Sequence, residues 1–377
     1  MTDLLENYSR FPFSLIKGEE VYLFDENGKR YLDFTSGIGV MNMGYSFEAG
    51  KIAVKTQIDA LSHLSNLYQN PLQEKVAAKL SQNHEYKAFF CNSGTEANEA
   101  ALKLTRLIKS GQKVLAFNHG FHGRTFGAMS ATMQEKIQAG FSPLLPDFVC
   151  SDYNDVDGLW QVLSNQNIGA IILEMVQGEG GVLPITPEFV QVLKEAQKAG
   201  ILLIIDEVQT GIGRTGKLFS FEHFGLKPDI FTVAKALANG IPTGAMLCKN
   251  EYADYFSKGK HGSTFGGNPL AMASANEVLT AMTPDFLSEV TDKSEFFLSV
   301  LTEKLSVKSQ VKAIRSVGLM LGIQLTDGQK ITEILGMLRD EGLLALSAGD
   351  DVIRLLPPLI MTKAELVKGA EILEKVL

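Results

Sequence analysis

The stretch that decides the fold is ILLIIDEVQTG, residues 201–211, in which an apolar run stops at an acidic residue, Asp206. A short apolar run rich in β-branched residues is typical of a strand buried on both faces of a parallel sheet. The stretch IFTVAKA at 230–236 repeats the arrangement, because its apolar run is followed by Lys235. Ligands of open parallel sheets bind at the carboxyl ends of the strands, so we expect Asp206 and Lys235 to face one site.

On either side of these two stretches, short apolar runs alternate with helical patterns. Helices are expected at 96–108 and 187–199, and further strands are expected at 87–91, 114–117, 168–173 and 245–248. Strands that alternate with helices predict an α/β fold whose mostly parallel sheet is covered by helices on both faces.

The two ends of the chain follow a different pattern. Runs at 20–24 and 29–34 flank the turn DENG at 25–28, which predicts a hairpin. After about residue 268, a helix is expected at 269–282 and another at 330–341, with strands at 311–317, 319–324 and 352–355. This region predicts a second, smaller α/β domain.

The composition and charge disfavour one class of function. The chain has 377 residues, of which 45% are hydrophobic, and its formal net charge is −8. A nucleic-acid-binding protein needs a basic face, so that function is disfavoured.

The cysteines and histidines give no sign of a metal centre or a disulfide framework. Three cysteines lie far apart without a CxxC pair, and six histidines form no HExxH motif. The N-terminus lacks the pattern of a signal peptide, and no apolar run has membrane-spanning length. We therefore expect a reduced, soluble, cytoplasmic protein without a metal.

Two polar motifs follow the strands expected at 87–91 and 114–117. In NSGTEANE, 92–99, Ser93 caps a helix, and Gly94 and Thr95 place free amides at its start, which suits a phosphate. A plain helix cap is the alternative interpretation. In NHGFHGRT, 118–125, Phe121 is suited to stack on a flat ring and Arg124 to bind a carboxylate, although such residues more often serve packing or the surface.

The two charged strand ends give the strongest signal. Burying Asp206 is costly unless it is paired, and one suitable partner is the protonated pyridine nitrogen of an electron-accepting cofactor. A bound magnesium ion is the competing interpretation, but no GxxxxGK[ST] loop precedes it. Lys235 is a candidate for Schiff-base formation, whereas a lone lysine at a strand end more often extends to solvent. Their occurrence on consecutive strands favours one shared cofactor.

These motifs together resemble the class III aminotransferases of pyridoxal-phosphate (PLP) fold type I, and within that class the acetylornithine aminotransferases. The resemblance covers nearly the whole chain. Its pieces stand in the family's order: NSGTEANE (92–99), FHGRT (121–125), EMVQGEGG (174–181), DEVQTG (206–211), AK (234–235), STFGGNP (263–269) and RLLPPL (354–359).

The resemblance implies a role in cofactor binding for several residues. Lys235 would hold PLP as a Schiff base and move the substrate proton. Asp206 would pair with the pyridine nitrogen, and Gly94 and Thr95 would bind the phosphate. Phe121 would stack on one face of the ring.

The resemblance further implies that Val208 packs on the other face and that Gln209 binds near the ring oxygen. Thr264 would bind the phosphate of the neighbouring subunit, which implies a homodimer with shared active sites.

For the substrates, the resemblance implies that Arg124, Arg354 and Ser263 form the binding site. Glu179 would gate Arg354 by pairing with it between half-reactions. The implied reaction moves the δ-amino group of N2-acetylornithine to 2-oxoglutarate and yields N-acetylglutamate semialdehyde and glutamate, a step of arginine biosynthesis. Alternatives on the same fold are ornithine, 4-aminobutyrate and succinyl-diaminopimelate aminotransferases. A metal-dependent nucleotide enzyme and a PLP-binding protein without turnover are the alternatives outside this class.

The chain departs from the family's pattern at two places. GYSFE at 44–48 stands where the family often has Gly-His-x-His-Pro, so Tyr45 and Phe47 change that segment. Ile38 stands where ornithine aminotransferases usually carry a tyrosine, which favours an acylated substrate. The resemblance also implies a large PLP-binding domain over 46–268 and a discontinuous small domain over 1–45 and 269–377.

Overall fold

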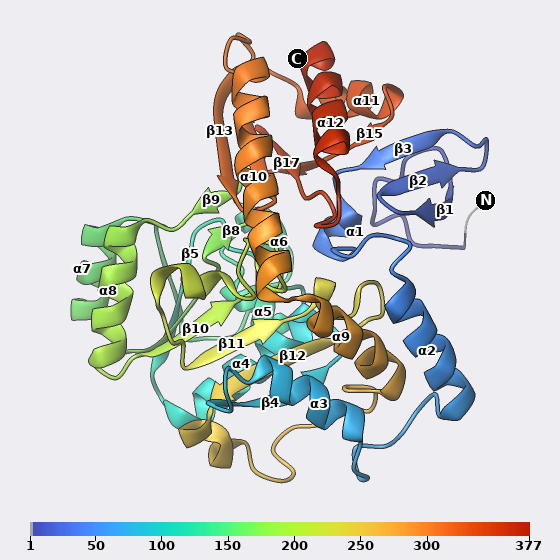
Figure 1. The fold of residues 1–377 in the computed structure, drawn as a ribbon. Coiled ribbons are helices and arrows are strands. Elements are labelled where there is room, and N and C mark those ends of the chain that lie inside the picture. The colour runs from blue at the N-terminus through green and yellow to red at the C-terminus, as the bar shows by residue number, and fades with distance from the viewer. Residues whose placement is uncertain (1–2) are drawn as a thin grey trace.

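A seven-stranded sheet forms the centre of the protein in the computed structural model, which describes residues 3–377 (Figure 1). The first two residues of the N-terminal segment, in which we expect no signal peptide, lie outside the described residues. The strands lie in the order β4 (Tyr86–Cys91), β12 (Gly244–Lys249), β11 (Ile230–Val233), β10 (Leu202–Asp206), β7 (Ile168–Leu173), β5 (Lys113–Phe117) and β6 (Phe148–Ser151). Strand β12 is antiparallel to both neighbours and the other pairings of this sheet are parallel, so the predicted mostly parallel α/β fold is confirmed.

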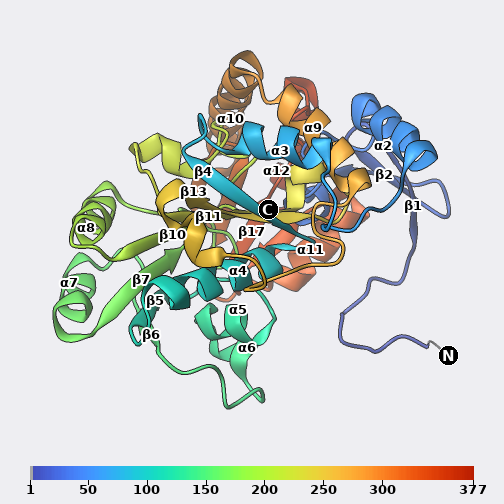
Figure 2. The ribbon, with the colours of Figure 1, turned by 90° about the horizontal axis from the view of Figure 1, so that it is seen from below.

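Helices cover both faces of this sheet (Figure 2). One face packs against α3 (Pro71–Leu80), α7 (Val156–Asn165), α8 (Pro187–Lys198) and α9 (Pro269–Ala281), and the other against α4 (Gly94–Ile108) and α5 (Phe126–Ala131). In β10, Leu203 and Ile205 belong to the first core and Leu202 and Ile204 to the second. Neighbouring side chains of a strand point to opposite faces, which explains why this strand is a continuous apolar run.

Most predicted elements lie within one or two residues of their observed bounds. Strand β10 starts at Leu202 and includes Asp206, so the strand predicted at 201–205 is shifted by one residue. The helix predicted at 330–341 is α11 (Ile331–Asp340), and the strand predicted at 319–324 is β14 (Met320–Leu325). The short strand β6 and the helices α2 (Glu48–Ala60), α3, α6 (Glu135–Gln138) and α7 were not predicted.

The N-terminal and C-terminal segments form two further sheets beside the central one (Figure 1). The first has the order β1 (Leu15–Glu19), β2 (Tyr22–Asp25), β3 (Arg30–Asp33) and β15 (Leu343–Leu344), and it confirms the hairpin at the DENG turn. The second has the order β13 (Val311–Val317), β14, β17 (Val352–Leu355) and β16 (Leu346–Ala348). Helices α10 (Pro284–Leu305), α11 and α12 (Lys363–Val376) pack with them.

The hairpin and the C-terminal segment share one apolar core. Strand β3 pairs in parallel with β15, and the Phe34 and Phe297 rings meet edge to face with centroids 5.5 Å apart. Helix α9, in contrast, packs its apolar side chains into the core of the central sheet. The division into domains at 46–268 and at 1–45 with 269–377 stays a prediction.

Short elements complete the described chain: α1 (Ser36–Gly39), β8 (Val176–Gln177), β9 (Leu183–Pro184), η1 (Ser220–Phe224), η2 (Lys235–Ala238) and η3 (Asn250–Phe256). Within residues 3–377, no helix combines the length and the apolar character needed to cross a bilayer.

A fully buried arginine, Arg214, connects the loop after β10 to the small sheets. Its guanidinium donates to the carbonyl oxygens of Leu319 at 2.8 Å and Pro357 at 2.6 Å, and also to the side-chain oxygen of Asn42. Burial lowers the pKa of Arg214 to about 9. Arg214 therefore satisfies acceptors on three segments that are distant in sequence.

We expect Arg214→Ala to lower the free energy of unfolding by about 3 kcal/mol or more, because it leaves buried acceptors unpaired and creates a cavity. A lower urea midpoint would show this. The exposed Arg30, which lies over the Tyr22 ring at 4.5 Å, provides the control, and Arg30→Ala should change stability by less than about 1 kcal/mol. Equal midpoints for the two variants would contradict the connecting role of Arg214.

Candidate active site

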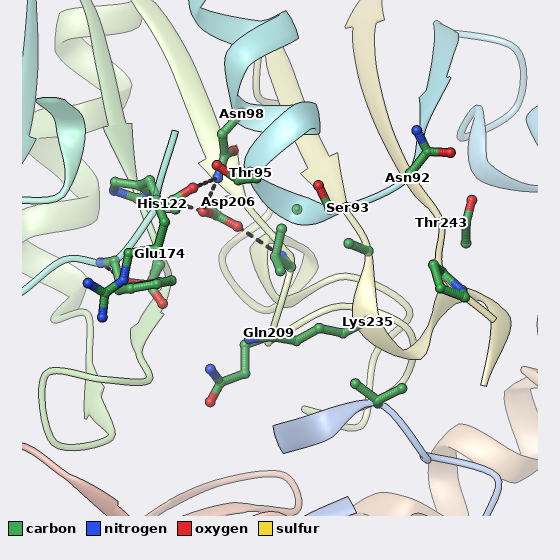
Figure 3. Close-up of a pocket in the computed structure, with 18 of the residues that line it drawn as sticks. Asn92, Ser93, Thr95, Asn98, His122, Glu174, Asp206, Gln209, Lys235 and Thr243 are labelled. Atoms are coloured by element: carbon green, nitrogen blue, oxygen red, sulfur yellow. Dashed lines mark hydrogen bonds and ion pairs between the residues drawn. The ribbon is translucent and has the colours of Figure 1, made fainter. Parts of the chain in front are cut away.

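The loops at the carboxyl edge of the central sheet enclose a cavity of about 470 Å³ (Figure 3). Eight of the predicted site residues line it: Gly94, Thr95, Phe121, Arg124, Asp206, Val208, Gln209 and Lys235. Asp206 is paired in register with Thr232 of β11, and Lys235 follows three positions later in the chain. The two charged strand ends are therefore brought together as the strand pattern predicts.

Asp206 is held in place by four donors around its buried carboxylate. Oδ2 accepts from Asn98 Nδ2 and from His122 Nδ1, both at 2.8 Å, and these side chains point at Asp206 in Figure 3. Oδ1 accepts from the Val208 amide at 2.9 Å and more weakly from the Thr232 hydroxyl at 3.5 Å. These bonds offset the cost of burying the charge and fix the direction in which the carboxylate points.

His122 and Glu174 form the second layer of charge around Asp206. Burial of the His122 ring opposes its protonation, but the hydrogen bond and the charge of Asp206 outweigh burial, so the pKa of His122 is raised. Burial raises the pKa of Glu174 to about 7, against the opposing charge of His122. His122 Nδ1 and Asp206 Oδ2 thus lie 2.8 Å apart in a buried pair, in which Asp206 favours the protonated form of the His122 ring.

Lys235 begins the short helix η2, and one residue separates it from the end of β11. Its φ is 42°, in the left-handed region that a side chain rarely adopts, so the surrounding packing holds it in a strained conformation. Burial first, and then the positive charge of Arg354, lower the pKa of the Lys235 amine, although Glu179, Asp206 and Glu174 pull the other way. A lowered pKa makes more of the neutral amine available as a nucleophile or base.

The start of helix α4 forms the polar end of the cavity. Ser93 caps the helix by accepting from the Glu96 amide, and the first amides of a helix have no partner within the helix itself. A Cβ atom on Gly94 would lie 2.7 Å from Val208 Cγ1, so only glycine lets the two loops approach this closely. The Thr95 hydroxyl lies 2.8 Å from that of Thr125.

Phe121 and Arg124 come from the loop after β5. Phe121 is half-buried in the cavity wall, and the Arg124 guanidinium lies over its ring, 5.8 Å from the centroid. Arg124 is exposed, so its charge is available to a ligand at the mouth of the cavity. Both side chains line the cavity, and their roles in stacking on a ring and in binding a carboxylate stay predictions.

Arg354 and Glu179 form an ion pair beside the cavity. Arg354 Nη1 donates to Glu179 Oε1 at 2.7 Å and to Gln209 Oε1 at 3.1 Å. The Arg354 side chain is 3% exposed and that of Glu179 is 33% exposed. The sequence predicts a contact of Gln209 near the cofactor ring oxygen, but in this structure its side-chain oxygen accepts a hydrogen bond from Arg354.

Ser263 and Thr264 lie on the loop before α9, outside the residues that line the cavity. The Ser263 hydroxyl accepts from Asn92 Nδ2 at 3.2 Å and from the Gly266 amide at 3.0 Å, which makes it part of the loop structure. Thr264 is exposed. The structure does not bring Thr264 into the cavity of its own chain.

Three residues that the structure places around Asp206 were not singled out from the sequence: Asn98, His122 and Glu174. All three lie within the motifs quoted above, at 92–99, 121–125 and 174–181. Glu174 directly follows β7, His122 lies five residues after β5 and Asn98 lies seven residues after β4. A polar side chain after a strand was the only available signal, and it does not say which neighbour each side chain contacts.

The residues of the cavity fit PLP part by part. A carboxylate faces the position for a ring nitrogen, an amine is available for the aldehyde, and helix amides with a hydroxyl suit the phosphate. The cavity volume is in the range of small-molecule sites. Among residues 3–377, no group of three or more His, Cys, Asp or Glu side chains is arranged to hold a metal ion.

Comparisons with known proteins point to one family. The family model described as aminotransferase class-III matches residues 5–377. A protein of Lactococcus lactis subsp. lactis named acetylornithine aminotransferase is 76% identical over 377 residues, which cover 100% of both chains.

Solved structures agree with this similarity. The ornithine aminotransferase of Toxoplasma gondii, in a structure that reveals partial occupancy of PLP at its active site, superimposes with a TM-score of 0.94 at 30% identity. That match covers 99% of this chain and 92% of the other. The N-acetylornithine aminotransferase of Stenotrophomonas maltophilia gives a TM-score of 0.85 at 30% identity, over 98% and 96% of the two chains.

Proposed function

Because this chain belongs to the class-III aminotransferase family, we propose that it transfers the δ-amino group of N2-acetylornithine to 2-oxoglutarate. The products are N-acetylglutamate semialdehyde and glutamate, a reaction of arginine biosynthesis. The chain is a PLP-dependent aminotransferase. The observation that supports the proposed pair of substrates is the ion pair between Arg354 and Glu179 beside the cavity that Lys235 lines.

This pair suits a site that must accept two different substrates in turn. The reacting carbon of 2-oxoglutarate bears a carboxylate, which a free Arg354 binds through its planar fork. The reacting carbon of the δ-amine of N2-acetylornithine bears none, so Glu179 neutralises Arg354 while that donor is bound. Glu179 is one-third exposed, so it can leave the pair and turn toward solvent at little cost.

Lys235 supplies the amine that holds the cofactor and then moves the proton. When bound, PLP supplies an electron-accepting ring that stabilises charge on the reacting carbon and stores the amino group between half-reactions. The lowered pKa of Lys235 keeps its amine available as a base in the cavity. Because both substrates use one site in succession, ping-pong kinetics are expected.

Asp206 maintains the positive charge on a ring nitrogen placed against it. Its carboxylate is oriented by Asn98 and His122, which fix Oδ2, and by the Val208 amide, which fixes Oδ1. The amides at the start of α4 and the Thr95 hydroxyl would hold the phosphate, and Phe121 and Val208 would contact the ring. Arg124 at the mouth would bind the carboxylate of the acetylated end of the donor.

We also propose a homodimer, in which Thr264 reaches the phosphate site of the partner subunit and Ser263 supports its loop. Thr264 is exposed and lies away from its own cavity, which is the placement such a role requires. A cytoplasmic location is proposed as well, since the cysteines Cys91, Cys150 and Cys248 are all free.

A panel of amino donors with 2-oxoglutarate as acceptor tests this function. The panel contains N2-acetylornithine, ornithine, 4-aminobutyrate and succinyl-diaminopimelate, and the measured quantity is kcat/KM for each. The proposal requires the highest value for N2-acetylornithine. A higher value for any of the other three would assign the chain to that activity instead.

Ile38 provides a test of the preference for an acylated donor. It lies in α1 with φ at 66° and is 45% exposed, next to Gly39, where an added Cβ would meet Gln209 and Leu356. We expect Ile38→Tyr to raise kcat/KM for free ornithine relative to N2-acetylornithine by about tenfold, the effect of one added polar contact. Ile38→Leu is the control and should leave the ratio unchanged. An unchanged ratio in Ile38→Tyr would exclude this position from substrate selection.

A further inference from the structure

Glu174 follows strand β7 and places a buried carboxylate between two functional loops. The residue is 6% exposed, and it lines the cavity (Figure 3). Oε2 accepts from the Phe121 amide at 3.0 Å, and Oε1 accepts from the Gly178 amide at 3.3 Å. One oxygen therefore holds the residue that lies against the ring position, and the other holds the residue directly before Glu179.

The Gly178 segment is confined from its other side by Gln209. A Cβ on Gly178 would lie 2.5 Å from Gln209 Oε1, the atom that also accepts from Arg354. Glu179 then accepts from the same Arg354 nitrogen. Glu174 therefore binds the backbone amide of Gly178, the residue next to Glu179 in the ion pair, through Oε1. Through its other oxygen, Oε2, it binds the backbone amide of Phe121.

We infer that Glu174 is a positioning residue that couples the cofactor-facing Phe121 loop to the Glu179 gate. The inference rests on the proposed function, because it assigns the ion pair of Arg354 and Glu179 the role of a gate. A glutamine in this place keeps the size of the side chain but presents an NH₂ group to one of the two amide donors. At least one of the two hydrogen bonds is then lost.

Coupling through Glu174 predicts a change in the preference between the two amino donors, which a general loosening of the structure does not predict. Glutamate needs Arg354 free, because its reacting carbon carries a carboxylate, whereas N2-acetylornithine does not. Loss of the Gly178 hydrogen bond destabilises the closed gate and favours glutamate. A change that merely loosens the fold lowers both half-reactions in parallel.

The test compares Glu174→Gln with wild type in single-turnover half-reactions of the PLP-loaded enzyme. We expect the ratio of kcat/KM for glutamate to that for N2-acetylornithine to rise by about fivefold or more, the effect of one lost hydrogen bond. In the apoenzyme, titrated with PLP and followed by absorbance, we expect the Kd for PLP to rise by about the same factor because Phe121 is released. If Glu174→Gln does not fold, Glu174→Asp, which is too short to reach both amides, is measured in the same way.

Glu207 provides a matched control. It is also a buried carboxylate whose pKa burial raises to about 7. It accepts from Ser220 Oγ and Thr210 Oγ1, each at 2.6 Å, and from the Phe221 amide at 3.0 Å, but it contacts neither loop in question. Glu207→Gln should leave the substrate ratio within about twofold of wild type.

The outcomes separate the inference from the proposed function. A shift above about twofold in the substrate ratio or in the Kd for PLP in the Glu174 variant, without a matching ratio shift in Glu207→Gln, supports the coupling. A change below about twofold in both quantities, or an equal ratio shift in Glu207→Gln, overturns it. Failure of the wild-type enzyme to use N2-acetylornithine would refute the proposed function alone. The best donor of the panel then replaces N2-acetylornithine in the ratio.

Discussion

Lys235→Ala is expected to lower the rate of transamination by at least about 10³-fold, because it removes both the amine that holds the cofactor and the base that moves the proton. The loss is specific to this position, since Lys235 lines the cavity and burial lowers the pKa of its amine. Purified wild-type protein should be yellow and should lose its visible absorbance on addition of an amine donor, whereas the variant should be colourless. Steady-state rates and absorbance spectra measure both effects.

An exposed lysine serves as the control for this prediction. Lys227 forms an ion pair with Glu85 at 2.8 Å on the surface, and its side chain is 69% exposed. Lys227→Ala should keep its colour and nearly its full rate. A Lys235→Ala protein that transaminates at the wild-type rate would refute the assignment.

Asp206→Asn is expected to have the second-largest effect, a loss of about 10²–10³-fold in kcat, the range seen when one oriented electrostatic partner of a reacting group is removed. The amide keeps the size of the side chain but no longer stabilises a positive charge on the ring nitrogen. The asparagine oxygen can keep the bonds from Asn98 and His122, whereas the NH₂ group replaces the oxygen that accepts from the Val208 amide, so that bond is lost.

Asp206→Asn is also expected to change the pKa of His122. The pKa of His122 is raised because the hydrogen bond and charge of Asp206 outweigh the burial of the ring. Without the Asp206 carboxylate, only the charge of Glu174 opposes burial, so the pKa of His122 should fall below its wild-type value and the neutral ring should persist to lower pH. Titration of the His122 ring by NMR measures the change. An unchanged pKa in Asp206→Asn would show that Asp206 does not control the charge of His122.

The central sheet and its two charged strand ends could be predicted from the sequence for a physical reason. A strand buried on both faces has to be apolar throughout, so the sequence shows where the apolar runs of β10 and β11 give way to Asp206 and Lys235. The pairing of Arg354 with Glu179, in contrast, joins positions 175 residues apart and was expected only from the resemblance to a family.

Other features depend on contacts that no local pattern contains. Strand β6 has only four residues, two of which are half-buried. It lies at the edge of the sheet, where β5 is its neighbour. The left-handed conformation of Lys235 is imposed by its surroundings and cannot be inferred from a run of alanines and leucines. Glu174 looks like an ordinary strand-end acid until its two amide partners, Phe121 and Gly178, are brought to it.

Covalent labelling tests most directly the claim that Lys235 holds the cofactor. Borohydride reduces the carbon–nitrogen double bond that joins a lysine to PLP and makes the attachment permanent. After digestion of the reduced holoenzyme, mass spectrometry should find the pyridoxyl phosphate on the peptide that contains Lys235 and, in stoichiometric amount, on no other peptide. A stoichiometric label on a different lysine, with Lys235 unmodified, would contradict the account.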